Sequence, residues 1–421
     1  MQLWVRWLSV LALVISFSAG CSLIPSRDDA LARYEKSRQE LSGAAPAVRQ
    51  AQYEQEAATA DDGGLTLSDL SPDNLGSTVR KLTGNGPNPE VARALFQEAE
   101  QLYRDATQLR QQDADASQAK FIAAAERFDE AALRWPNSSL EQDALFMAGE
   151  SYFFGDHYWD AETAYEKLFK AYPNSRHLDA VQPRRFAIAQ YWLQLDSDDP
   201  RSFYELNFFD ESQPTRGLFA NAMRVFDRIR LDDPTGKLAD DATLALGNAY
   251  FARKKFLKAD EYYTDLRKTF PSSEHQFEAH FLGLKAKLEA YQGPDYSANA
   301  LNEADKLLTQ VRRQFPVEAE RERKYLAKEA ARIQYLEAER DWLMAKRFDR
   351  RTEYGAAKYY YLSLVTDYRE TPFGEQAEQR LREINGLPDV PDQPLPWLAA
   401  IFPARDNVKP IMAANPATVR R

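Results

Sequence analysis

The feature that most constrains the fold is a pattern that occurs twice, between Ala144 and Ser175 and again between Thr243 and Ser273. Its large apolar residues stand three or four apart, the spacing of one helix face, and a proline closes each copy because it cannot continue a helix. Each copy therefore predicts two helices joined by a turn. The matching residues are Gly149, Tyr152, Tyr158, Ala161, Tyr165, Leu168 and Pro173 in the first copy, and Gly247, Tyr250, Phe256, Ala259, Tyr263, Leu266 and Pro271 in the second.

The second half of this pattern recurs in four further stretches of the chain. Self-similarity of this kind is typical of the tetratricopeptide repeat (TPR), a helix-turn-helix unit of about 34 residues. We therefore expect an all-α fold, a TPR-type helical-hairpin solenoid of about six repeats over residues 89–386. The further halves are Ala124, Phe128, Ala131 and Pro136; Ala222, Phe226, Ile229 and Pro234; Ala304, Leu308, Val311 and Pro316; and Ala357, Tyr361 and Leu364.

The N-terminus has the features of a secretory signal over residues 1–20, with Arg6, an apolar run from Leu8 to Phe17 and small residues before Cys21. That order resembles the bacterial lipobox, although Ser18 stands where leucine is usual. Cys21 is the only cysteine of the chain, so it has no internal disulfide partner. We therefore predict lipidation of Cys21; the alternative is an ordinary signal peptide that contains a cysteine by chance.

The segments on either side of the repeats lack helical periodicity. Residues 21–88 contain clusters of glycine, asparagine and aspartate, which predict a flexible, lipid-anchored tether. Residues 387–421 form a Pro-rich tail. The net charge of the chain is -10, and the repeat region has no basic stripe, which argues against nucleic-acid binding.

Two stretches depart from the repeat period. An insertion over residues 195–214 mixes acidic residues with aromatic ones, and the candidates for a partner-binding loop are Phe203, Tyr204, Phe208 and Phe209. Insertions in repeat arrays form loops on one face, often the binding face. The alternative is that these aromatic residues fold back and fill a gap between helices. The second stretch predicts a long charged helix from Val317 to about Lys346.

A repeat array of this type offers a groove lined by the first helix of each repeat. Aromatic residues beside acids and amides suit an extended or helical peptide. The alternative is that Phe146 and Phe153 pack between helices. The predicted groove positions are Asp143, Phe146, Glu150, Phe153 and Phe154 in one repeat, and Asp241, Leu244, Asn248 and Phe251 in the other.

The sequence predicts no catalytic residue, metal site or cofactor. It has no phosphate-binding glycine loop and no nucleophile elbow. Its four histidines are His157, His177, His275 and His280, and none is four residues from another, as a zinc-binding helix pair requires. Carboxylates are numerous, but they are scattered over faces expected to be solvated. An enzyme with its site in the 195–214 insertion or the tail is a minor alternative.

A lipid-anchored repeat array resembles the outer-membrane assembly lipoprotein family typified by BamD, also called YfiO or ComL. The likeness covers residues 89–386 and is strongest at 149–175, 247–273 and 354–377. It implies a non-enzymatic scaffold on the periplasmic face of the outer membrane that binds a barrel-assembly protein or unfolded outer-membrane proteins. The long tether, the insertion, the extra repeat and the Pro-rich tail depart from that family. A scaffold for cell-wall or secretion machinery is the alternative.

Overall fold

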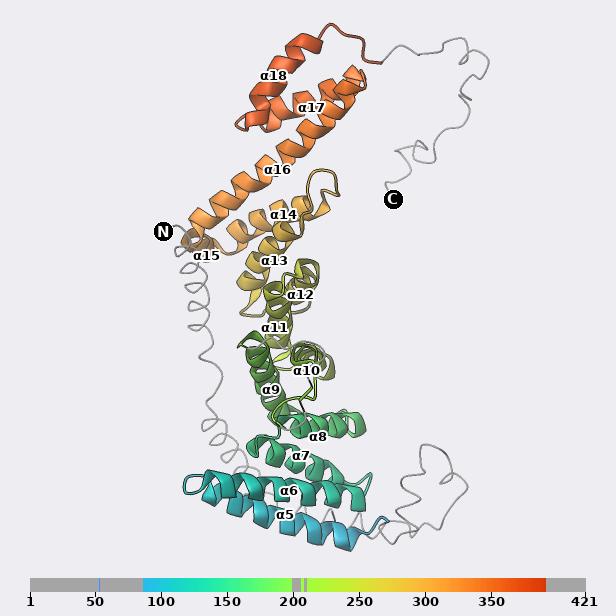
Figure 1. Cartoon of the computed structure of the whole chain (residues 1–421), viewed down its shortest axis with the longest axis vertical. Helices are drawn as coiled ribbons and strands as arrows, with labels where there is room; N and C mark the ends of the chain where they lie inside the picture. The colour runs from blue at the N-terminus through green and yellow to red at the C-terminus, as the bar shows by residue number, and fades with distance from the viewer. Residues whose placement is uncertain (1–52, 54–85, 199–205, 208–209, 391–421) are drawn as a thin grey trace, which may run out of the picture. The chain divides into compact units, whose positions relative to one another are not determined.

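The computed structural model describes Tyr53 and residues 86–198, 206–207 and 210–390. These described residues form helices and turns and contain no strand, and Figure 1 labels the helices α5 to α18. The chain is therefore all-α, as predicted. The hairpins are α5 (Pro89–Leu109) with α6 (Ala114–Arg134), α7 (Ser139–Phe154) with α8 (Tyr158–Ala171), α9 (Leu178–Asp198) with α10 (Leu218–Asp232), α11 (Ala239–Ala252) with α12 (Phe256–Thr269), α13 (Gln276–Ala290) with α14 (Asn299–Gln314), and α16 (Arg323–Arg350) with α17 (Tyr354–Asp367); α15 (Pro316–Arg321) and α18 (Pro372–Ile384) complete the set.

The hairpins fall into two compact units that divide between Gln276 and Phe277. The first unit has a core that runs from Ala92 in α5 to Leu246 in α11. In the second unit one core lies among α13, α14, α15 and the first part of α16, and another among the rest of α16, α17 and α18. Each helix in the described part of the chain is too short or too polar for a bilayer crossing.

Glycine lets the two helices of a hairpin approach closely. A Cβ placed on Gly149 of α7 would lie 2.3 Å from the ring of Tyr165 in α8, and one on Gly247 of α11 would lie 2.6 Å from Tyr263 in α12. Both tyrosines are fully buried, so their rings have little room to move. The repeated pattern therefore has glycine at the point where the two helices of each hairpin come closest.

Three hairpins share one turn geometry. Asp156, Lys254 and Thr352, each 98 residues from the next, have φ of 61°, 58° and 57°, in the left-handed region. The next amide then bonds back five residues, as in His157 N to Tyr152 O at 3.0 Å. This is the Schellman geometry that ends a helix, and here it directs the chain into the second helix of α7–α8, α11–α12 and α16–α17.

Two elements differ in extent from the sequence prediction. α9 continues to Asp198, beyond the predicted start of the insertion, because Leu195 still packs against the core of the first unit. The long charged helix is divided into α15 and α16 by Glu322, whose φ and ψ of -94° and 14° leave the helical region. The hydrogen bond from Glu322 N to Glu318 O, at 3.0 Å, is kept, so the division is a local one.

Candidate functional site

Asp143, the first of the predicted groove positions, is buried in α7 and binds three side chains. His177 Nε2 lies 2.7 Å from its Oδ1, the Tyr53 hydroxyl donates to its Oδ2 at 2.5 Å, and the Arg176 guanidinium donates to both oxygens. Burial by itself would raise the pKa of Asp143, but the hydrogen bond from His177 and the charge of Arg176 outweigh it and lower that pKa to about 2. Asp143 is therefore an ionised carboxylate at neutral pH.

The three predicted phenylalanines of α7 are buried against basic side chains. Phe146 stacks on the imidazole of His177, with ring centroids 4.1 Å apart and ring planes 1° from parallel. The guanidinium carbon of Arg184 lies 5.3 Å from the ring centroid of Phe153 and 5.5 Å from that of Phe154. Such contacts between a cation and a ring are attractive, and more so when shielded from water. Phe146 and Phe153 thus have neighbours inside the chain, and their binding of a peptide stays a prediction.

Glu150 is fully buried and links three helices. Its Oε1 accepts a hydrogen bond from the Tyr165 hydroxyl of α8 at 2.7 Å, and Arg184 of α9 donates to both of its oxygens at 3.3 Å. A buried ion pair is costly to form, but removal of one partner costs about 3–5 kcal/mol because the other charge stays buried. Glu150 therefore serves as an internal link between repeats.

The corresponding positions of α11 make similar contacts. His275 Nε2 lies 2.9 Å from Oδ1 of Asp241, and the Tyr263 hydroxyl donates to Asn248 at 2.8 Å. The side chain of Asp241 is 33% exposed, compared with 4% for Asp143, so the second site is more open. The two remaining predicted positions are Leu244, which is buried, and Phe251, which is half-buried.

The basic partners of these acids follow them by a constant interval, which sequence reasoning missed. The pairs Asp143–His177, Glu150–Arg184 and Asp241–His275 each span 34 residues, the length of one repeat. A comparison of acidic and basic residues at that interval would have found them.

Arg185 of α9, which is fully buried, adds a link between neighbouring hairpins. It binds Glu162 of α8, with the shortest contact at 2.7 Å, and donates to Asp232 at the end of α10 at 2.8 Å. Sequence reasoning missed this residue as well, since its partners follow no repeat interval.

The described part of the insertion folds back onto repeat two and α9. The Trp192 indole donates to the Ser212 carbonyl at 2.9 Å, and the Trp159 amide donates to the Glu211 carbonyl at 3.4 Å. Glu211 and Ser212 therefore contact helices, while the alternative that the aromatic residues of the insertion fold back between helices stays a prediction. The predicted partner-loop residues Phe203, Tyr204, Phe208 and Phe209 lie outside the described residues, as do Cys21 and residues 391–421 of the tail.

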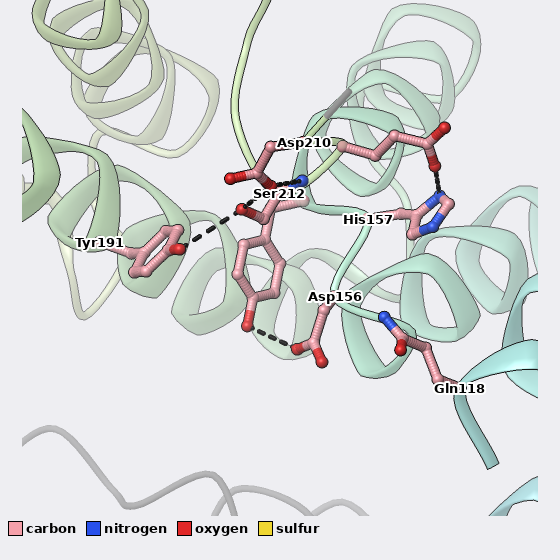
Figure 2. Close-up of a pocket in the computed structure, with 8 residues that line it drawn as sticks. Gln118, Asp156, His157, Tyr191, Asp210 and Ser212 are labelled. Atoms are coloured by element: carbon pink, nitrogen blue, oxygen red, sulfur yellow. Dashed lines mark hydrogen bonds and ion pairs between the residues drawn. The ribbon is translucent and has the colours of Figure 1, made fainter. Parts of the chain in front are cut away.

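This fold-back forms an open, polar pocket of about 520 Å³, shown in Figure 2. Its walls come from the start of α6, the α7–α8 turn, α9 and the insertion. Tyr191 and Ser212 hydroxyls lie 3.3 Å apart, and the Tyr158 hydroxyl donates to Asp156 at 2.9 Å. The lining residues are Gln118, Asp156, His157, Tyr158, Tyr191, Asp210, Glu211 and Ser212.

One group of described residues beside this pocket has the donor types of a metal site. The ligand atoms of His157, Asp160 and Glu211 all lie within 4.8 Å of one another. Both carboxylates approach the same atom, His157 Nδ1, at 2.5 Å for Glu211 and 3.5 Å for Asp160. That convergence is the arrangement of an ion pair, and Glu211 is 59% exposed. The sequence did not indicate this group because Glu211 comes from the insertion.

The fold and these links define a class of protein, an all-α array of helical hairpins joined by contacts one repeat apart. The tetratricopeptide repeat family model matches residues 143–175 and 241–273, which lie in α7–α8 and α11–α12. The chain therefore contains two stretches that match the tetratricopeptide repeat, within an all-α fold of the TPR-type helical solenoid. A comparison with curated proteins found no match.

Proposed function

We propose that the chain is a non-catalytic scaffold of the cell envelope that binds partner proteins in the assembly of outer-membrane β-barrel proteins. The observation that carries the proposal is the set of TPR hairpins, since TPR arrays bind extended or helical segments of other proteins. The signal-like N-terminus and Cys21 support an envelope location. Lipidation of Cys21 would hold the chain on a membrane, because each buried methylene contributes about 0.8 kcal/mol.

A photoreactive amino acid at Phe251 tests for the partner. Phe251 is half-buried on α11, a first helix, and so reaches the surface at a predicted groove position. Leu257 of α12, which is 63% exposed, is the matched control on a second helix. After irradiation of living cells, we expect mass spectrometry to find adducts with the barrel-assembly protein or with unfolded barrel proteins at Phe251 but not at Leu257.

Two results would contradict the proposal. Adducts with cell-wall or secretion components alone would favour the other scaffold function, and identical adducts at both positions would show that the first helices have no special role. Fractionation of the same cells tests the anchor. A Cys21→Ser variant is expected to leave the membrane fraction, and a variant that stays there would exclude lipidation of Cys21 as the cause of membrane attachment.

A further inference from the structure

Tyr53, 90 residues before Asp143, is seated on the first-helix side of the first unit. Its hydroxyl donates to the buried Asp143 of α7 at 2.5 Å, and its main-chain carbonyl accepts from the Arg93 guanidinium of α5 at 3.2 Å. Its ring meets Trp135 edge to face, with centroids 6.5 Å apart and planes at 62°. The hydroxyl, the ring and the main-chain carbonyl of Tyr53 are thus each contacted by a different residue.

The groups that hold Tyr53 are fixed by contacts of their own. Asp143 also binds His177 and the guanidinium of Arg176, so its charge is stabilised without the phenol. Arg93 lies over the ring of Trp135, 5.4 Å from its centroid. The receiving surface is therefore built from α5, the end of α6, α7 and the segment before α9, and none of its parts belongs to the segment that carries Tyr53.

The chemistry of this surface selects tyrosine. A buried carboxylate needs hydrogen-bond donors, and a phenol supplies one to Asp143. Phenylalanine would fill the same space but leave the carboxylate one donor short. The backbone contact to Arg93 adds a requirement for an accessible carbonyl, which the helical backbone at Tyr53 provides.

We propose that this surface, made of Arg93, Trp135, Asp143, Arg176 and His177, is a tyrosine-recognition site for a helical segment of a partner protein. Tyr53 of the chain itself occupies the site, and a tyrosine from the partner displaces it. This inference rests on the proposed function, because it names the kind of segment that the scaffold binds. It also gives the N-terminal segment a role as a competitor within the same chain.

A labelled peptide with the sequence of residues 47–59, AVRQAQYEQEAAT, serves as the probe. Fluorescence anisotropy measures its dissociation constant for the full chain and for a Tyr53→Ala variant, in which the site is vacated. We expect at least tenfold tighter binding to Tyr53→Ala, because the internal competitor is gone. A second peptide with phenylalanine in place of its tyrosine is expected to bind Tyr53→Ala about tenfold more weakly, since hydrogen bonds to charged groups are the strong ones.

Two further variants in the Tyr53→Ala background show where the peptide binds. Arg93→Lys shortens the guanidinium contact and leaves Asp143 in place, so it is expected to weaken binding about fivefold with little effect on folding. Arg313→Lys makes the same change at an exposed arginine of α14, in the second unit, and is expected to leave binding unchanged. Circular dichroism checks that each variant is folded.

Equal affinities of the full chain and Tyr53→Ala would overturn the inference, and so would equal affinities of the tyrosine and phenylalanine peptides or the absence of any binding. The proposed function fails separately. If partners are cross-linked at Phe251 but their yield is the same in Tyr53→Ala and in the unchanged chain, the scaffold function stands and the tyrosine site falls. If no partner is cross-linked by any variant while the peptide binds as expected, the tyrosine site stands and the scaffold function falls.

Discussion

At the scale of single residues, the acids of the first helices serve mainly to join repeats. Asp143 and Glu150 are buried, and each contacts a basic side chain that lies 34 residues further along the chain. Burial of a charge is unfavourable without a partner, so each pair stabilises the fold only when both members are present. The phenylalanines of α7 pack on the same two basic side chains. Acidic and aromatic residues that join repeats can therefore have the sequence pattern of a peptide-binding groove.

The depressed pKa of Asp143 predicts a loss of stability in acid. Because the folded state lowers this pKa to about 2, the carboxylate stabilises the fold above its ordinary pKa of 3.8, and that contribution disappears as the pH falls from about 4 to 2. We expect the first unit of the unchanged chain to lose about 2 kcal/mol from this group over that range. Urea unfolding at several pH values, followed by circular dichroism, measures it.

Asp143→Asn is the variant that isolates this effect. Its unfolding free energy is expected to be lower at pH 7 and to fall less steeply in acid, because the group that titrates is gone. Asp241→Asn is the matched control, and its effect is expected to be smaller because that carboxylate is 33% exposed. An unchanged acid slope in Asp143→Asn would show that other carboxylates dominate.

At the scale of elements, three hairpin turns hold a residue other than glycine in the left-handed region of backbone conformation. Asp156, Lys254 and Thr352 occupy the position where glycine is usual in a Schellman motif. Asp tolerates this conformation better than lysine, because its short side chain bonds locally. Thr352 is β-branched and is the most strained of the three; within the first unit, the turn of α11–α12 has more strain to release than that of α7–α8.

Lys254→Gly is expected to stabilise the first unit by about 0.5–1 kcal/mol, because glycine adopts a positive φ without steric cost. The entropy that glycine adds to the unfolded chain reduces this gain. Thermal unfolding compares it with Asp156→Gly, for which we expect a smaller gain. A lower melting temperature for Lys254→Gly would show that the lysine makes stabilising contacts that outweigh the strain.

The helix pairs were predictable from the sequence. Asp143 was also singled out there, but its contact with Tyr53 was not predictable. Gly149 and Tyr165 belong to a pattern that recurs with Gly247 and Tyr263, so their close approach follows from spacing alone. Tyr53 and Asp143 are 90 residues apart and belong to no shared pattern. Their meeting depends on where the chain places a segment outside the repeats. The division at Glu322 also escaped prediction, because periodicity does not register a change in one residue's backbone.

At the scale of the whole molecule, stability is divided among cores that each involve neighbouring helices. α16, α17 and α18 share one such core in the second unit, around Tyr361 and Leu364. Because the stability of repeat proteins is close to a sum of local and nearest-neighbour terms, damage to this core should stay local.

Tyr361→Ala is expected to destabilise α16–α18 by about 3–5 kcal/mol, since it removes a buried aromatic ring. Hydrogen exchange followed by mass spectrometry should show faster exchange in those helices and unchanged exchange in α5–α8. Tyr359, also in α17 but 70% exposed, offers the control, and Tyr359→Ala is expected to change neither region. Faster exchange throughout the chain in Tyr361→Ala would mean that the molecule unfolds as one cooperative body.

The pairing of acids and cations one repeat apart also limits how such a protein can be rearranged. Glu150 is followed one repeat later by Arg184, whereas Asn248, its counterpart in α11, is followed at the same interval by Leu282. A hairpin transplanted from one place to the other would leave a carboxylate facing a leucine, or an arginine facing an amide. The modules are therefore not interchangeable, and a chimaera or a new array made from them must carry both halves of each pair.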